Sequence, residues 1–313
     1  MAAPRPLTRR TLLAATALTP LAGCTSPATP APPAPSAPSA PPATTSAAPP
    51  APDEHLVALE RKYDARLGVF ALNTSTGASV AHRADERFAF CSTFKGLAAA
   101  AVLHRNPMSH LDTLVRYAEG DLLKSGVVTS QHVATGMTIR QLCDAAIRFS
   151  DGTAGNLLLR DLGGPQQLTD YLRGLGDTVT RMDRTEPAIV EATPGDPRDT
   201  ATPRSLGTDY QKIVLGDALP EDKRALLRDL MERPATQAGA QRVRAGLPKD
   251  WRVADKTGTG DYGTLNDIAL VWPPGKPPLL IAIMSSKAAK DAKYDHQPML
   301  AEAASYAATA LTR

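Results

Sequence analysis

Apolar residues recur at helical spacing near both ends of residues 53–313. Leu56, Leu59 and Tyr63 follow Asp53, a residue type that commonly caps the first turn of a helix. An Ala-rich segment, residues 299–311, has the same period at the other end of the chain. The pattern therefore predicts one helix at each end of this part of the chain.

Short apolar runs next to these two helices predict strands. Residues 67–72 and 78–81 flank the polar segment 73–77, which ends in glycine, so they form an expected hairpin. Three further runs lie toward the C-terminus, at residues 252–256, 266–272 and 279–284. We expect them to join the hairpin in one antiparallel sheet of about five strands, a usual size.

The middle of the chain has helical period in five segments: residues 94–104, 139–149, 153–162, 165–175 and 221–232. The fold class is therefore predicted as α+β with two lobes. One lobe, about residues 53–84 and 234–313, holds the sheet flanked by the N- and C-terminal helices. The other, about residues 85–233, is all helical, and a small-molecule site is expected in the cleft between the lobes.

The N-terminus has the order of an export signal. Arg5, Arg9 and Arg10 precede an apolar run, residues 12–22, which leads to Gly23 and Cys24. The arginine pair resembles a twin-arginine signal, and residues 21–24 resemble a bacterial lipobox. We expect a signal peptide over residues 1–23 and lipidation of Cys24; the alternative is a simple cleaved signal with an incidental cysteine.

Residues 24–52 consist almost entirely of Pro, Ala, Ser and Thr, a composition that cannot form a core and favours extended conformations. This segment is interpreted as a linker that precedes a catalytic domain over residues 53–313. The apolar run before it is shorter than the roughly 20 residues that span a bilayer, so contact with a membrane is expected only through a lipid on Cys24. The protein is accordingly expected to be exported and anchored to the outer face of the cell membrane, or secreted.

Charge and histidine spacing exclude several function classes. The formal net charge is +3 and the cationic residues are dispersed, which does not suggest nucleic-acid binding. The six histidines show no metal-ligand spacing, so neither a metal nor another cofactor is expected. In an exported protein Cys91 and Cys143 either form a disulfide or remain buried thiols, and we favour buried thiols.

Three short motifs carry candidate chemistry. Ser92 and Lys95 lie three residues apart at the start of a predicted helix, so both side chains project from one face. A nearby lysine activates a serine, and the helix N-terminus offers N–H groups to an oxyanion. Alone this pair is weak evidence for catalysis, because the same two residues also occur in an ordinary capped helix with a solvated lysine. The others are Ser150-Asp151-Gly152, between two helices, and residues 256–260, Lys-Thr-Gly-Thr-Gly, after a short strand.

In this order the three motifs resemble those of class A β-lactamases and penicillin-binding proteins, with Gly152 where asparagine is usual. Residues 181–200 resemble the omega loop of class A enzymes, with Glu186 at the position of the carboxylate that activates the deacylating water. The resemblance extends over residues 53–313 and includes segments 139–143, 156–159 and 244–248. It implies a monomeric hydrolase that opens penicillins and cephalosporins and so gives antibiotic resistance.

The resemblance also implies a role for each motif residue. Ser92 attacks the lactam carbonyl, and either Lys95, or Glu186 through a water, removes its proton. Ser150 passes a proton to the departing nitrogen, and Glu186 directs water at the resulting ester. Lys256 keeps the local potential positive.

Substrate binding is assigned in the same way. Thr257, Gly258 and Thr259 follow Lys256 and hold the substrate carboxylate, and the backbone N–H groups of Ser92 and Thr259 hold the oxyanion. Many relatives add an arginine from the strand after this motif, but residues 261–269 contain no Arg or Lys. Arg242 is the candidate replacement. Because Arg242 and Arg244 are two apart, an extended backbone would point both the same way.

Five further positions bear on the loop and on turnover. Arg184 and Asp199 are expected to form the ion pair that closes the loop, although such a pair is also compatible with a weak surface bridge. Val190 replaces the asparagine that usually helps to hold the water, and Gly152 lacks the amide that usually contacts the substrate. Ser125 is expected at the rim, where relatives carry an aromatic residue.

These departures leave two alternatives to a fast hydrolase. One is a penicillin-binding protein or peptidase that stays acylated, against which Glu186 argues and which Val190 favours. The other is a tethered lipoprotein that binds β-lactams or a partner, with slow deacylation or a vestigial serine motif, against which the retained charged motif residues argue.

Overall fold

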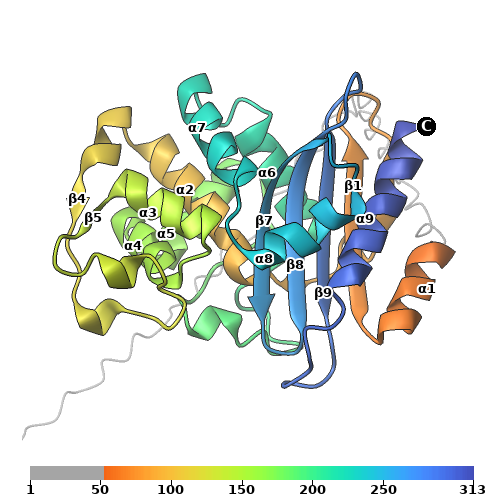
Figure 1. The fold of residues 1–313 in the computed structure, drawn as a ribbon, viewed down its shortest axis with the longest axis horizontal. Coiled ribbons are helices and arrows are strands. Elements are labelled where there is room, and N and C mark those ends of the chain that lie inside the picture. Colours follow the sequence, from red (N-terminus) through yellow and green to blue (C-terminus); the bar gives the residue numbers. More distant parts are fainter. Residues whose placement is uncertain (1–52) are drawn as a thin grey trace, which may run out of the picture. The chain divides into compact units, whose positions relative to one another are not determined.

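The computed structural model describes residues 53–313, and its centre is one antiparallel sheet (Figure 1). Its strands are β1 (Arg66–Asn73), β2 (Ser79–His82), β7 (Arg252–Gly260), β8 (Thr264–Trp272) and β9 (Leu279–Ser286). They are arranged in the order β2-β1-β9-β8-β7 with every pair antiparallel, which confirms the predicted sheet. The expected signal peptide, linker and Cys24 lie outside the described residues.

Helices cover both faces of the sheet, so its central strands are apolar on both sides. On one face, α1 (Glu54–Tyr63) and α9 (Gln297–Thr312) lie side by side and confirm the two terminal helices. Ile281 and Ile283 of β9 belong to the core on this side, whereas Leu280 and Ala282 belong to the core on the other. This alternation is the two-residue period of a strand.

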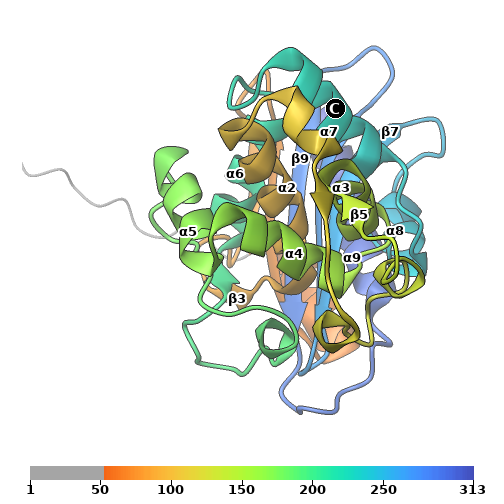
Figure 2. The same cartoon turned by 90° about the vertical axis from the view of Figure 1, so that its left-hand side faces the viewer.

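The predicted helical part is confirmed. It comprises α2 (Phe94–Arg105), α3 (Ile139–Arg148), α4 (Gly152–Leu162), α5 (Pro165–Gly174) and α7 (Glu221–Glu232), as Figure 2 shows from its own side. Every residue of α2 from Phe94 to Leu103 is buried, because α3, α4, α5, α6 and α7 all pack around it. The first turn of a fully enclosed helix is a rigid place for a reactive side chain.

The helix α6 (Pro203–Val214) is absent from the sequence-based prediction, yet it covers the second face of the sheet. It begins with a capping box, in which the Thr202 hydroxyl accepts a hydrogen bond from the Ser205 amide. Its buried residues include Leu206, Tyr210 and Ile213. The Tyr210 hydroxyl donates to the carbonyl of Thr93 over 2.5 Å, which ties α6 to the segment that enters α2.

Several smaller elements also lie outside the prediction. Two short strand pairs form, β3 (Phe88–Ala89) with β6 (Thr200–Ala201) and β4 (Leu114–Val115) with β5 (Met137–Thr138), and α8 (Gln237–Gln241) is a short helix. The strand predicted to end at Lys256 continues to Gly260, so the Lys-Thr-Gly motif is part of β7 and does not follow it. Within residues 53–313 no helix is long and apolar enough to span a membrane.

Candidate active site

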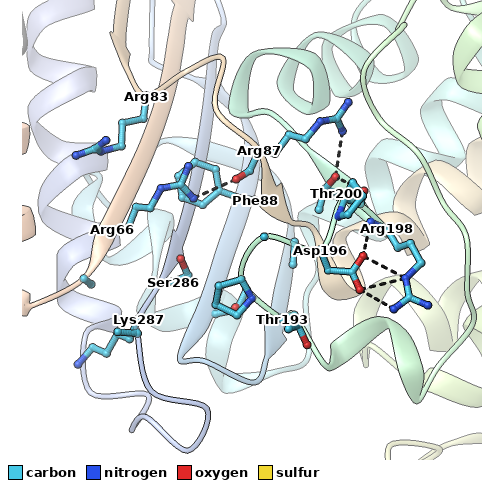
Figure 3. Close-up of a pocket in the computed structure, with 18 of the residues that line it drawn as sticks. Arg66, Arg83, Arg87, Phe88, Thr193, Asp196, Arg198, Thr200, Ser286 and Lys287 are labelled. Carbon is cyan, nitrogen blue, oxygen red and sulfur yellow. Dashed lines mark hydrogen bonds and ion pairs between the residues drawn. The ribbon is translucent and has the colours of Figure 1, made fainter.

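The three motifs and the loop with Glu186 meet at one cavity of about 820 Å³. Its lining includes Ser92, Ser150, Glu186, Thr257 and Thr259. A second cavity, of about 880 Å³, lies behind the same loop and presents arginines such as Arg66, Arg87 and Arg198 (Figure 3). None of the motif residues lines the second cavity, so the candidate chemistry belongs to the first.

Ser92 and Lys95 stand where the turn η1 (Cys91–Thr93) enters α2. Lys95 Nζ lies 2.9 Å from Ser92 Oγ, 2.7 Å from the Ser150 carbonyl oxygen and 2.6 Å from Glu186 Oε1. Ser92 Oγ in turn donates to Glu186 Oε1 over 3.2 Å. The nucleophile candidate therefore touches both of its candidate bases.

Lys95 is fully buried. Burial lowers the pKa of its ammonium, and the adjacent Glu186 carboxylate opposes this shift. Its three acceptors match the three N–H groups of an ammonium, whereas a neutral amine has only two. Gly155 leaves the space for this side chain, because a Cβ there would lie 2.8 Å from Lys95 Cε.

Two backbone positions at the site adopt a left-handed conformation that non-glycine residues rarely take. Cys91, immediately before Ser92, has φ of 48°, and Ser150 has φ of 56°. Such positions persist only where surrounding contacts enforce them, and they cluster at functional sites. Here they present the two motif serines to one cavity.

The Lys-Thr-Gly motif reaches Ser92 and Ser150 along β7. Lys256 Nζ donates to Ser150 Oγ over 3.0 Å and to the Thr257 carbonyl over 2.9 Å. Gly258 permits β7 to approach η1, since a Cβ there would lie 2.6 Å from the Phe90 carbonyl oxygen. Burial, together with the positive charge of Lys95, lowers the pKa of Lys256 to about 7.

Arg242 lies beside the same strand and is 2% exposed. Its guanidinium donates to Thr259 Oγ1 over 2.7 Å and to the carbonyls of Gly258 and Asn266 over 2.7 and 2.8 Å. Burial lowers its pKa to about 10. An arginine thus contacts Thr259, a residue that lines the cavity.

The expectation that Arg242 and Arg244 point the same way is wrong. The chain here is a 3-10 turn, η6 (Val243–Gly246), and not a strand. Arg244 Nε donates to Asp255 Oδ1 over 2.5 Å, away from Thr259. A 3-10 turn repeats every three residues, so residues two apart face different directions.

The loop of residues 181–199 is closed by the expected ion pair. Arg184 Nε lies 2.5 Å from Asp199 Oδ2, and Asp199 is 1% exposed. Asp199 Oδ1 also accepts the amides of Asp183 and Arg184 over 2.8 and 3.0 Å. This hydrogen-bonded ion pair, with its buried Asp199 carboxylate, joins the two ends of the loop and forms its neck. It is not the weak surface bridge that the sequence also allowed.

Asn156 is a residue of the site to which sequence reasoning gave no role. Its side chain brackets the backbone of Glu186: Oδ1 accepts the Glu186 amide over 3.0 Å, and Nδ2 donates to the Glu186 carbonyl over 2.8 Å. The signal was present, because Asn156 lies four residues after Gly152 and so shares its helical face. Both residues of α4 thus face the loop.

Ser125 and Gly152 also lie beside the Glu186 carboxylate, and Val190 shares its cavity. Ser125 Oγ donates to Glu186 Oε2 over 3.1 Å. Val190 lines the cavity with an apolar side chain, and Gly152 begins α4. Ser125 therefore does more than occupy the rim, where the sequence placed it.

The two cysteines in the described part are free and buried, which confirms the thiol alternative. Burial raises the pKa of both Cys91 and Cys143 to about 12, so neither is a reactive thiolate at neutral pH. Gly260 lies against Cys91, since a Cβ at Gly260 would be 2.6 Å from Cys91 Sγ.

Comparison with known proteins gives one consistent match. A family model described as the β-lactamase enzyme family matches residues 51–310. The chain is 56% identical over 265 residues to a β-lactamase of Mycobacterium tuberculosis, covering 82% of this chain and 85% of that relative. It is 54% identical over 268 residues to a β-lactamase of Amycolatopsis lactamdurans, covering 85% and 88%.

Solved structures agree with the sequence matches. The crystal structure of a class A β-lactamase from Clostridium kluyveri superposes with a TM-score of 0.80 at 47% identity and covers 83% of this chain and 98% of that one. A halotolerant bacterial β-lactamase gives a TM-score of 0.81 at 44% identity, with 83% and 100% covered.

Proposed function

Because the chain belongs to the β-lactamase enzyme family, as a class A enzyme that hydrolyses the amide bond of β-lactams, we propose that Ser92 is its nucleophile. The observation that carries this proposal is the contact of Ser92 Oγ with both Lys95 Nζ, at 2.9 Å, and Glu186 Oε1, at 3.2 Å. A serine hydroxyl is a weak nucleophile unless a base accepts its proton, and here the base is in direct contact.

In acylation, Ser92 Oγ bonds to the lactam carbonyl carbon and its proton passes to Glu186. The three hydrogen-bond acceptors around Lys95 support proton transfer to Glu186 and not to Lys95. They suit a charged ammonium, which stabilises negative charge but cannot accept a proton. The oxyanion is held by the amides of Ser92, in the turn η1 that enters α2, and Thr259, on the edge strand β7. When the C–N bond breaks, Ser150 gives its proton to the nitrogen, and Lys256, 3.0 Å away, stabilises the resulting charge. The proton that Glu186 took from Ser92 then passes to Ser150, so Glu186 is a carboxylate again before deacylation.

The substrate carboxylate lies at the β7 end of the cavity. Lys256 and Arg242 supply positive charge there, and the hydroxyls of Thr257 and Thr259 supply hydrogen bonds. Gly258 lets β7 lie close to the turn that carries the nucleophile, and Gly152 leaves room for Glu186 and Ser125 at the cavity. We infer that penicillins and cephalosporins bind across this space.

In deacylation, Glu186 takes a proton from water while the water oxygen attacks the ester carbon, and the bond to Ser92 Oγ breaks as the serine regains a proton. Asn156 and the Arg184–Asp199 pair hold the backbone around Glu186 for this step. Val190 offers the water no hydrogen bond, which favours slow deacylation as the second candidate behaviour.

One experiment tests these assignments. The purified protein is mixed with a chromogenic cephalosporin while hydrolysis and protein mass are followed together. Sustained turnover, no adduct with Ser92→Ala and a persistent adduct with Glu186→Gln are expected. A single burst followed by a stable adduct on the unmodified protein would identify the slow-releasing alternative, and hydrolysis by Ser92→Ala would refute the nucleophile.

We also propose that residues 1–23 are a signal peptide, that Cys24 is lipidated and that residues 24–52 link the anchor to a monomeric catalytic domain. The support is the sequence order of arginines, apolar run and cysteine. Cell fractionation tests the anchor: Cys24→Ala is expected to move activity from the membrane fraction to the medium, with Cys143→Ala as the control. Equal membrane retention of both variants would count against lipidation.

A further inference from the structure

The two carboxylate oxygens of Glu186 face different partners. Oε1 is in contact with Lys95 and Ser92, whereas Oε2 accepts a hydrogen bond from Ser125 Oγ over 3.1 Å. Among residues 53–313, no other side chain donates to Oε2. Ser125 therefore restrains the oxygen of the carboxylate that Lys95 and Ser92 do not contact.

Gly152 makes this contact possible. A Cβ at position 152 would lie 2.1 Å from Glu186 Oε2 and 2.2 Å from Ser125 Oγ, and both distances are much shorter than the contacts that real Cβ atoms make. Any side chain at this position would displace one of the two groups. The glycine in the second motif thus has a structural consequence beyond the loss of an amide.

The segment that carries Ser125 is fixed to the start of α4. The buried Asp151 carboxylate accepts the amides of Val128 and Thr129, each over 2.9 Å, and also the Thr129 hydroxyl. Thr153 Oγ1 accepts the Leu123 amide over 2.9 Å. Ser125 lies between these anchors, so its hydroxyl is presented to Glu186 by a restrained backbone even though the residue itself is exposed.

The spacing between Ser92 and Glu186 shows why rotation matters. Ser92 Oγ and Glu186 Oε1 are 3.2 Å apart, which is a direct hydrogen bond. A water bridging two oxygens needs about 2.7–2.8 Å to each of them, so it does not fit on this line. After acylation Ser92 Oγ has no proton to donate, and the carboxylate has to withdraw before a water enters.

We propose that Ser125 is a positioning residue for deacylation: when Oε1 gives up its contact with Ser92 after acylation, the Ser125 hydroxyl still holds Oε2, so the carboxylate stays oriented toward the entering hydrolytic water. The water then bonds to the ester carbon, gives one proton to Glu186, and the ester bond to Ser92 Oγ breaks with return of a proton to the serine. Val190, which lines the same cavity, has no polar side-chain atom for this task. The inference rests on the proposed role of Glu186.

The test separates acylation from deacylation by rapid mixing of the purified protein with a chromogenic cephalosporin, with protein mass followed over time. Ser125→Ala is expected to slow deacylation about tenfold or more, the effect of losing one hydrogen bond to a charged group, and to change acylation less. Ser125→Thr keeps the hydroxyl and is expected to restore most of the rate. Ser130→Ala is the matched control, because Ser130 lies on the same segment and its side chain has no hydrogen bond to Glu186.

Gly152→Ala supplies a second measurement. It is expected to slow deacylation by displacing the Ser125–Glu186 contact, and adding Ser125→Ala to it is expected to cost little more, because both changes remove one interaction. Deacylation by Ser125→Ala at the unmodified rate, or no recovery in Ser125→Thr, would overturn the inference. If Glu186→Gln deacylates normally, the proposed role of Glu186 fails instead, and the two failures are distinguishable.

Discussion

The ammonium of Lys256 lies 3.0 Å from the hydroxyl of Ser150, a residue that lines the same cavity as Ser92. The lysine comes from the edge strand of the sheet and the serine from the turn before α4. Burial beside Lys95 lowers the pKa of Lys256 to about 7. Its charge therefore depends on pH within the physiological range.

We predict from this pKa that substrate capture weakens in mild alkali. Below about pH 7 Lys256 of the free enzyme is charged and attracts the substrate carboxylate; as pH rises through its pKa the charge is lost. The value of kcat/KM is expected to fall about tenfold between pH 7 and 9. Steady-state rates across this range, measured for the unmodified enzyme and for Lys256→Arg, check the prediction. Arginine stays charged throughout, so an identical fall in both proteins would show that another group titrates.

Replacing Val190 with asparagine is predicted to speed the release of product. Val190 lines the cavity beside Glu186, and an amide there would give the water a hydrogen bond worth about 1 kcal/mol. Deacylation, followed by the decay of the acyl adduct, is expected to rise roughly fivefold. Val190→Ala is the control, because it removes apolar volume without adding a donor, and an equal rise in both variants would contradict the explanation.

Loosening the neck of the loop is predicted to slow deacylation and reduce stability. Asp199→Asn removes the charge that Arg184 contacts at 2.5 Å, in a position that is 1% exposed. We expect the free energy of unfolding to fall by about 2 kcal/mol and deacylation to fall about tenfold. Urea unfolding and adduct decay measure the two effects. Asp196→Asn disrupts a more exposed pair with Arg198 in the same loop and should change both quantities little.

Removing Arg242 is predicted to weaken substrate binding. Its guanidinium contacts Thr259 Oγ1 at 2.7 Å and stands where a substrate carboxylate is proposed to lie. Arg242→Gln is expected to raise KM about tenfold, the loss of one charge-assisted hydrogen bond. The exposed Arg252, with 58% of its side chain accessible, provides the matched control Arg252→Gln. An unchanged KM in Arg242→Gln would leave this arginine with a structural role only, as the support of the Gly258 and Asn266 carbonyls.

Local periodicity predicted most of the helices and strands because each of them buries one repeating set of apolar residues. The helix α6 lies outside the prediction although Leu206, Tyr210 and Ile213 have helical spacing and Pro203 stands in its first turn; what the local pattern does not specify is that this face packs on a sheet built from distant segments. The length of β7 is a similar case. Residues Thr257 to Gly260 have no strand pattern of their own, and their register with Thr264 to Asp267 of β8 makes them a strand.

The sequence by itself determined the fold class, the order of the motifs and the identity of Ser92, Lys95, Ser150, Glu186 and Lys256 as candidates, because these depend on residue type and spacing. Only the tertiary structure decided the directions of side chains. It separated Arg242 from Arg244, placed Asn156 around the backbone of Glu186 and brought Ser125 to its carboxylate. These contacts join residues that are 11 to 61 positions apart in the chain, and no local pattern specifies which of two neighbouring side chains a fold turns toward a cavity.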